Sequence, residues 1–234
     1  MDRNRWIIFG LICVVVFGVL LFNRKSDEVK VDSIDPGKVI TDNKPLPDHV
    51  FGSSSKKVVL IEYGDFQCPG CGNLFPKLKP LKEHYKDQLT FVFRDFPLSS
   101  IHPNAIAAAT AAEAAGLQGK WWEYHDKLYE NQEAWSSLST DQRGNVFAAY
   151  AKELGLDTAK FKKDITSSKL ADKIKRDQAL GKKAGVTATP TLVLNGKVLT
   201  QEEWSTPEKL EETIRDAIKA SGQTAPEKLS QTTN

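Results

Sequence analysis

The chain of 234 residues carries a formal charge of +2 and is 40% hydrophobic. It is long enough for one domain of about 150 to 200 residues with an appendage, and its apolar content excludes a wholly disordered chain. Because 32 basic residues face 30 acidic ones, we expect no nucleic-acid partner, which would require a basic excess. Three cysteines are too few for a disulfide-stapled mini-protein or an all-cysteine zinc site.

The amino terminus has the pattern of a membrane anchor. The run from Trp6 to Phe22 contains no charged residue, and as a helix it would be about 25 Å long, near the lower limit for crossing a bilayer core. We expect an uncleaved single-pass helix, although a cleaved signal peptide and a buried helix of a soluble protein stay open. Large residues at 20–22 are unlike a cleavage site. Cys13, inside the run, is expected to be an inert apolar residue.

Composition divides the rest of the chain. Polar, Pro-, Gly- and Ser-rich stretches flank a region in which apolar runs alternate with amphipathic ones. The expected organisation is a short tail (1–5), the anchor (6–22), a linker (23–47), a domain (48–222) with a helical insertion (about 103–184), and a flexible tail (223–234).

The first half of the domain has the pattern of a βαβ unit. An apolar run rich in branched residues at 57–63 predicts a buried strand, and 89–94 predicts a second one. Between them, apolar residues at helical spacing predict a helix over 69–86, in which Pro76 and Pro80 predict a kink or a break. Two strands joined by a helix predict a parallel pair.

The second half begins with helices and ends with a hairpin. Helical patterns fill the insertion, at 105–115, 120–131, 140–154, 158–165 and 168–184. Asn195-Gly196 between two apolar runs predicts a β-hairpin over 191–200. Thr206-Pro207 then begins a final amphipathic helix.

The chemistry lies in Cys68-Pro69-Gly70-Cys71, which follows the first strand and opens the first helix. Two residues between cysteines in a helical first turn bring the sulfurs close enough to bridge, and the free N–H groups there favour a thiolate on Cys68. Pro69 suits the first helical position, and Pro69-Gly70 shapes the turn. The spacing predicts a redox-active disulfide in which Cys68 is the nucleophile and Cys71 resolves the mixed disulfide.

Two other interpretations of this spacing are weaker. A zinc site would need two more ligands, and no two histidines have the separation of a zinc finger; the four are His49, His84, His102 and His125. A purely structural disulfide would close too short a loop to stabilise the fold appreciably. We therefore expect no metal and no cofactor.

At this point the sequence resembles a family. Glu62 six residues before Cys68, the Cys-Pro-Gly-Cys motif, Pro76, and Thr189-Pro190 before the hairpin together resemble the thioredoxin fold. The helical block, like the run at 64–69, resembles the DsbA-like branch, over about residues 48–220. The resemblance implies an α/β, thioredoxin-like fold with an inserted helical subdomain, here preceded by one transmembrane helix.

The resemblance also implies roles for single residues. Pro190 matches the family's cis-proline, whose loop presents the backbone of Thr189 to an extended substrate. Glu62 matches a buried acid that exchanges a proton with Cys71. Gly70 stands where oxidising relatives often carry histidine or an aromatic residue, which implies a less stabilised thiolate and a less oxidising pair.

Other conspicuous side chains have structural interpretations. Trp121, Trp122 and His125 are expected to be core or groove residues of the insertion, and His102, which precedes Pro103, a structural turn residue.

The resemblance implies a bacterial, extracytoplasmic thiol-disulfide oxidoreductase that passes the Cys68–Cys71 disulfide to reduced exported proteins. It also implies reoxidation by a quinone-linked membrane partner of the DsbB or vitamin K epoxide reductase kind. Beyond the apolar run the chain has no cysteine except this pair, which suits an oxidising compartment. Charges flanking the run are nearly balanced, so only the function places the amino terminus in the cytoplasm.

Three alternatives stay open at this level. One is a reductase or isomerase of the same fold, for example in cytochrome maturation. Another is a redox-inactive module that keeps the fold for its peptide groove. The third, cytosolic glutathione-dependent chemistry, is disfavoured by the apolar run.

Overall fold

The computed structural model describes residues 31–42 and 45–229. The anchor predicted over 6–22, with Cys13, lies outside these residues. Within the part of the chain that the structure describes, no helix is both long and apolar enough to cross a membrane.

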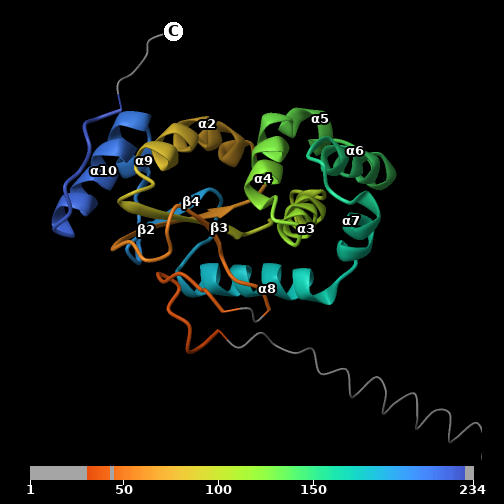
Figure 1. Cartoon of the computed structure of the whole chain (residues 1–234), viewed down its shortest axis with the longest axis horizontal. Helices are drawn as coiled ribbons and strands as arrows, with labels where there is room; N and C mark the ends of the chain where they lie inside the picture. Colours follow the sequence, from red (N-terminus) through yellow and green to blue (C-terminus); the bar gives the residue numbers. More distant parts are fainter. Residues whose placement is uncertain (1–30, 43–44, 230–234) are drawn as a thin grey trace, which may run out of the picture. The chain divides into compact units, whose positions relative to one another are not determined.

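The described domain is built on a five-stranded sheet with the order β1-β3-β2-β4-β5 (Figure 1). The central strand β2 (Val58–Gly64) pairs in parallel with β3 (Leu89–Asp95) and antiparallel with β4 (Thr191–Leu194). Two short antiparallel strands, β1 (His49–Phe51) and β5 (Lys197–Val198), form the edges. The predicted parallel βαβ unit and the hairpin are confirmed.

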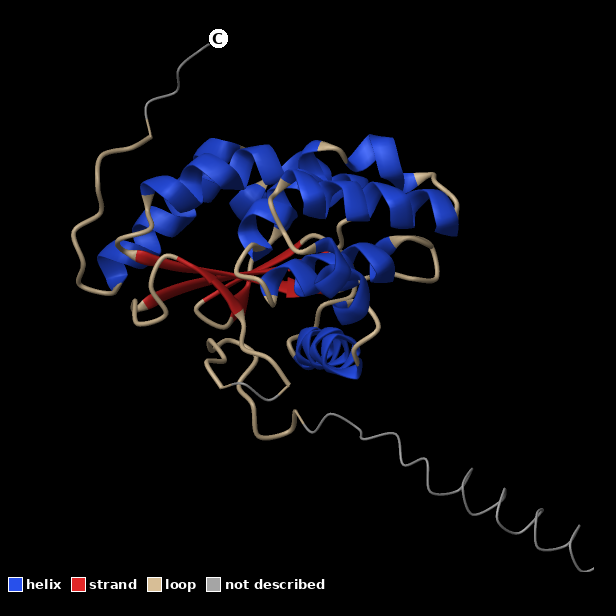
Figure 2. Ribbon diagram, turned by 45° about the vertical axis from the view of Figure 1, so that its right-hand side comes forward, coloured by secondary structure: helices blue, strands red, loops and turns tan. Residues whose placement is uncertain are grey.

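One face of the sheet is covered by α2 (Pro69–His84) and α10 (Pro207–Ala220), which share an apolar cluster with Leu60 of β2. Figures 1 and 2 show the sheet between this layer and α8 on the opposite side. Of the kink or break predicted at Pro76 and Pro80, the break does not occur, since α2 continues through both prolines. Burial of leucines on both sides of the prolines, against the same sheet face, stabilises the continuous helix.

The opposite face packs on α8 (Ser168–Lys183) and on part of the range predicted as linker. Leu180 of α8 and Ile40 share a buried cluster with Tyr63 of β2. Arg94 of β3 donates hydrogen bonds of 2.6 Å to the carbonyl oxygens of Pro36 and Lys38. The segment 31–42 is therefore held against the domain by burial and by hydrogen bonds.

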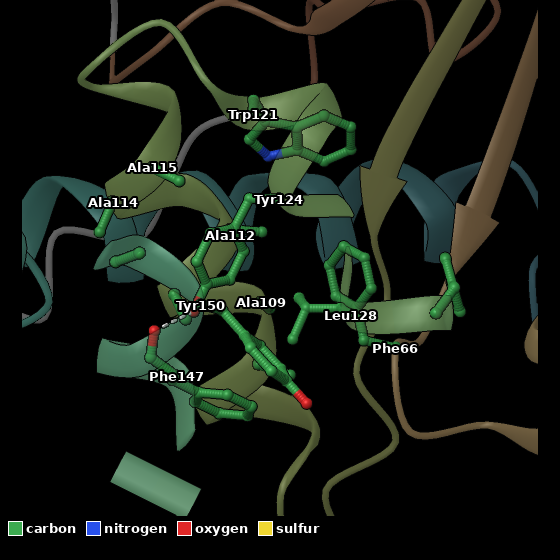
Figure 3. Packing of buried hydrophobic residues seen from close by; sticks show 14 of the residues in the cluster. Phe66, Ala109, Ala112, Ala114, Ala115, Trp121, Tyr124, Leu128, Phe147 and Tyr150 are labelled. Atoms are coloured by element: carbon green, nitrogen blue, oxygen red, sulfur yellow. Dashed lines mark hydrogen bonds between the residues drawn. The ribbon is translucent and has the colours of Figure 1, made fainter. Parts of the chain in front are cut away.

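The helical insertion confirms the predicted block. Its members are α3 (Ala105–Gly116), α4 (Trp121–Glu130), α5 (Gln132–Ser136), α6 (Thr140–Glu153), α7 (Thr158–Asp164) and α8. Small alanines such as Ala109 and Ala112 let the aromatic side chains of Tyr124 and Phe147 pack closely on α3 (Figure 3). The buried Tyr124 hydroxyl donates to the carbonyl oxygen of Phe147 at 2.8 Å. Trp121 belongs to this core, as predicted.

A buried ionic network, which the sequence did not predict, joins β3, α3 and α8. Asp48 accepts from Arg94 at 2.8 Å. On α8, Lys173 lies 2.5 Å from Asp177 and 3.4 Å from Glu113 of α3. These side chains are buried, so each charge depends on its partner for compensation.

Candidate active site

The two cysteines lie at the start of α2, directly beyond the end of β2. Cys68 is the N-cap residue with extended backbone angles, and Pro69 follows at the first helical position. Gly64, the last residue of β2, packs closely on the ring of Phe93, where a Cβ would lie 2.4 Å from the nearest ring atom. Both thiols are free; Cys68 is 8% exposed, and Cys71, one turn further in, is fully buried.

The loop before β4 packs on Cys68. The Cys68 thiol donates to the carbonyl oxygen of Thr189 at 3.3 Å, and the peptide bond between Thr189 and Pro190 is cis. A Cβ on Gly70 would lie 3.1 Å from the ring of Pro190. The structure therefore brings together Cys68, Gly70, Thr189 and Pro190.

The electrostatics of the two thiols differ. The pKa of Cys68 is lowered to about 5, first by a hydrogen bond with Cys71, then by the Thr189 side chain and by the backbone N–H groups of Cys71 and Gly70, against the opposing effect of burial. The pKa of Cys71 is raised well above its usual range by burial, and further by Cys68 and Glu62. At neutral pH the pair is thus one thiolate and one thiol, with the thiolate nearer solvent.

Glu62 is buried in β2 on the sheet face that α2 covers. Burial raises its pKa to about 8; Lys82 opposes this shift, and Cys68 adds to it. Its Oε1 atom has no hydrogen-bond partner among the described residues. A carboxyl group with such a pKa can hold or release a proton near neutral pH, beside a thiol whose pKa it influences.

Lys82 of α2 was not singled out in the sequence. It is almost fully buried, with its Nζ atom 4.4 Å from the ring centre of Trp122 and 3.6 Å from Asp126. Burial lowers its pKa, while Asp126 and Glu62 raise it. A lysine beside apolar positions of a helix was the available signal, but long cationic side chains usually reach solvent.

A second unpredicted group stabilises the turn that carries the cysteines. The buried Asp65 carboxylate accepts from the N–H groups of Gln67 and Leu98, both at 2.8 Å, and lies 2.7 Å from Nδ1 of His102. The Asp65 N–H lies 3.5 Å from Sγ of Cys71. His102, expected to be a turn residue, thus ties the loop after β3 to the active-site turn.

Two amide side chains complete the support. Gln132 of α5 donates to the carbonyl oxygens of Phe66 at 2.7 Å and Cys68 at 2.9 Å. Gln67 accepts from the Asn104 N–H at 2.6 Å and donates to the carbonyl oxygen of Ser136 at 2.7 Å. The insertion thereby fixes the backbone on the amino-terminal side of Cys68.

Histidine is a common metal ligand, but His125 has a structural environment here. His125 is buried among aromatic rings, and burial lowers its pKa to about 4, so it is neutral at pH 7. The described residues contain no group of three or more His, Cys, Asp or Glu side chains arranged to hold a metal ion.

This geometry agrees with the match to a family model. The model described as thioredoxin matches residues 44–216, and the chain belongs to this family. Among solved structures, the chain is similar to oxidised BdbD from Bacillus subtilis, with a TM-score of 0.62 and 23% identity over 78% of this chain and 99% of that one. It is also similar to alpha-DsbA1 from Wolbachia pipientis, with a TM-score of 0.63 and 21% identity over 74% and 92% of the two chains. These likenesses confirm the thioredoxin-like fold with a helical insertion.

The curated relatives that the chain matches are named as antiporters, unlike the solved structures. The chain is 34% identical to the Na(+)/H(+) antiporter NhaA 1 of Mycolicibacterium vanbaalenii over 194 residues, which are 81% of this chain and 30% of that protein. The chain therefore spans less than a third of the length of that relative.

Proposed function

We propose that the chain is a thiol-disulfide oxidoreductase that passes its Cys68–Cys71 disulfide to reduced exported proteins. The observation that carries this proposal is the unequal pair of thiols at the start of α2, with a Cys68 pKa of about 5 and a Cys71 pKa well above its usual range. A low pKa makes Cys68 a good leaving group and stabilises the reduced form of the pair, which favours release of the disulfide to a substrate.

The exchange has two steps. A substrate thiolate attacks Sγ of Cys68, the disulfide bond breaks, and Cys71 leaves with the electron pair. A second substrate thiolate then attacks the substrate sulfur of the mixed disulfide, and Cys68 leaves as a thiolate. Two electrons have then passed from the substrate dithiol to the Cys68–Cys71 pair.

The surrounding residues support each step. The Cys71 thiolate is unfavourable in its buried position, and Glu62, with a pKa of about 8, supplies the proton that neutralises it. The low Cys68 pKa arises although Gly70 carries no cation, because Cys71, Thr189 and backbone N–H groups provide the hydrogen bonds. A stable Cys68 thiolate favours the function of an oxidase over that of a reductase.

We further propose that residues 6–22 anchor the chain in the cell membrane, with the amino terminus in the cytoplasm and the catalytic domain outside. A quinone-linked membrane protein of the DsbB or vitamin K epoxide reductase kind would reoxidise the pair. The uncharged run, and the absence of any cysteine after it other than the Cys68–Cys71 pair, support this arrangement. We propose no ion transport, since the antiporter likeness concerns 30% of that protein.

Oxidation of a reduced two-cysteine peptide by the disulfide form of the full chain tests the activity. We expect stoichiometric formation of the peptide disulfide, abolished in Cys68→Ser and unchanged in Cys13→Ser, which controls for the remaining cysteine. Cys71→Ser, preloaded through Cys68 with an activated peptide disulfide, should retain the mixed disulfide. Peptide oxidation no faster than in buffer, or dependent on Cys13, would exclude the proposal.

A further inference from the structure

A cavity of about 280 Å³ lies in the helical insertion, between α3, α6 and α7. None of its lining residues belongs to the cysteine motif, to the Thr189–Pro190 loop or to the group around Glu62. Its volume is just below the range of about 300 to 1,000 Å³ that small-molecule sites occupy, which suits a small ligand. The cavity is thus a separate feature of the fold.

The cavity is mainly apolar, and an exposed glycine forms part of its lining. Phe147 of α6 and Phe161 of α7 contribute rings to its wall. Gly144 lies inside α6, and a Cβ added there would have no neighbouring atom within 4 Å. Glycine weakens a helix interior relative to alanine, and no close packing requires it here. A larger side chain at this lining position would meet no steric obstacle.

Two cations line the same cavity without acidic partners. Arg143 and Lys162 form no salt bridge with any residue that the structure describes. Arg143 donates through Nη1 to Oδ1 of Asn104, which leaves its other N–H groups available. Thr140, also in the lining, adds a hydroxyl group that forms no hydrogen bond within the described chain.

One lining residue is a large exposed hydrophobic. Ile165, beyond the end of α7, is 40% exposed. An apolar side chain beside an apolar hollow provides further surface that a bound tail can cover.

We propose that this cavity binds a small carboxylic acid with a short apolar tail. The carboxylate is held by Arg143 and Lys162 and accepts from the Thr140 hydroxyl, and the tail lies between Phe147 and Phe161 in the space beside Gly144. Arginine and lysine donate charge-assisted hydrogen bonds to carboxylates, and the apolar wall excludes a ligand that is polar throughout. This site is independent of the proposed redox function.

Arylalkanoates provide direct probes. Binding of phenylacetate, phenylpropionate and phenylbutyrate to the full chain in phosphatidylcholine nanodiscs can be followed by ligand-observed NMR, with empty nanodiscs as the blank. We expect saturable binding that strengthens up to about fourfold for each added methylene until the cavity is filled. Neutral phenylbutanol should bind about tenfold more weakly than phenylbutyrate, because it lacks the charge.

Matched variants distinguish binding in this cavity from nonspecific binding of the probe elsewhere on the chain. Gly144→Leu places a side chain in the cavity and should reduce phenylbutyrate binding at least about tenfold, without lowering the melting temperature, because leucine is the better helix former. Lys162→Gln should remove most of the preference for the acid over the alcohol. Lys163→Gln, at a neighbouring lysine that does not line the cavity, should leave it unchanged.

Three results would overturn the proposal. The first is an absence of saturable binding up to the solubility limit of phenylbutyrate. The second is equal affinity for the acid and the alcohol. The third is binding that persists in a folded Gly144→Leu chain, which would place the probe elsewhere. Redox assays are not needed for any of these readouts, so failure here leaves the oxidoreductase proposal standing, and the converse also holds.

Discussion

The thiol of Cys68 lies 3.3 Å from the carbonyl oxygen of Thr189, a residue 121 positions away in the sequence. This contact places the loop before β4 directly on Cys68, which is the less buried cysteine of the pair. The low pKa of Cys68 has other causes: a hydrogen bond with Cys71, the Thr189 side chain and the backbone N–H groups of Cys71 and Gly70 favour its ionised form.

The first prediction concerns the ionisation of Cys68. The reduced chain should be alkylated at Cys68 with a pH midpoint near 5, because Cys71, Thr189 and backbone N–H groups stabilise the thiolate. Cys71→Ala removes the largest of these contributions and should raise the midpoint, whereas Cys71→Ser keeps a donor and should raise it less. Thiolate absorbance and the kinetics of alkylation by iodoacetamide, each followed against pH, measure the midpoint in the parent chain and in both variants. A midpoint near the usual value of about 8.5 would contradict the assignment.

The second prediction concerns Glu62 and pH. Its pKa is about 8 in the folded chain, above the usual value of 4.5, so the unfolded chain loses this proton first as pH rises. Glu62 therefore reduces stability progressively between about pH 4.5 and 8, by about 1.4 kcal/mol per unit. Glu62→Gln, which is neutral throughout, should gain about 3 kcal/mol relative to the parent between pH 5 and 8.

Urea unfolding of both reduced chains at several pH values measures this difference. The same variant should slow peptide oxidation most at the step that releases Cys71. A stability difference independent of pH would show that Glu62 is ionised in the folded state.

The third prediction concerns Gly72. A Cβ there would lie 2.3 Å from Oε1 of Gln132, so Gly72→Ala should displace Gln132 and leave the carbonyl oxygens of Phe66 and Cys68 without its hydrogen bonds. We expect Gly72→Ala and Gln132→Ala each to cost about 1 to 2 kcal/mol of unfolding free energy. The double variant should cost little more than either, because both changes remove the same contacts.

Gly144→Ala is the matched control for Gly72→Ala, because both glycines lie within helices and only Gly144 has open space around its Cβ position. It should stabilise the chain by about 0.5 to 1 kcal/mol. Equal effects of the two substitutions would refute the role assigned to Gly72.

The fourth prediction concerns the buried ionic network. Lys173→Met leaves Glu113 and Asp177 buried without their shared cation, and should cost about 3 to 5 kcal/mol of unfolding free energy. Lys175→Met, two residues away on α8 at an exposed position, should change stability by less than about 0.5 kcal/mol. Chemical denaturation compares them, and similar losses would mean that the network contributes no special stabilisation.

The periodicity of apolar residues in the sequence was sufficient to predict most elements of the fold. Strands β2 and β3, the helices of the insertion other than α5, and the Asn195-Gly196 hairpin were predicted because each has a local pattern. The elements that were missed, β1, α5 and α9 (Gln201–Trp204), are too short to show a period. Of the kink or break predicted in α2, the break does not occur, because tertiary packing outweighs the lost hydrogen bonds.

The site was predictable only in part. Cys68 and Cys71 are defined by local spacing, and Glu62 stood out as an acid within an apolar strand. The contacts of Gln132 and of Asp65 with His102 join distant segments; no local pattern encodes them. The ionic network was missed for the same reason, since charged residues on a helix are ordinarily assigned to its solvent face.

The redox state of Cys68 and Cys71 in growing cells tests the central proposal most directly. Acid quenching followed by alkylation with a mass-adding thiol reagent separates the dithiol from the disulfide form, and Cys13→Ser removes the other thiol from the readout. The proposal predicts that the pair is mostly disulfide and becomes dithiol when reoxidation is blocked. A pair that is mostly dithiol in growing cells would contradict the oxidase function.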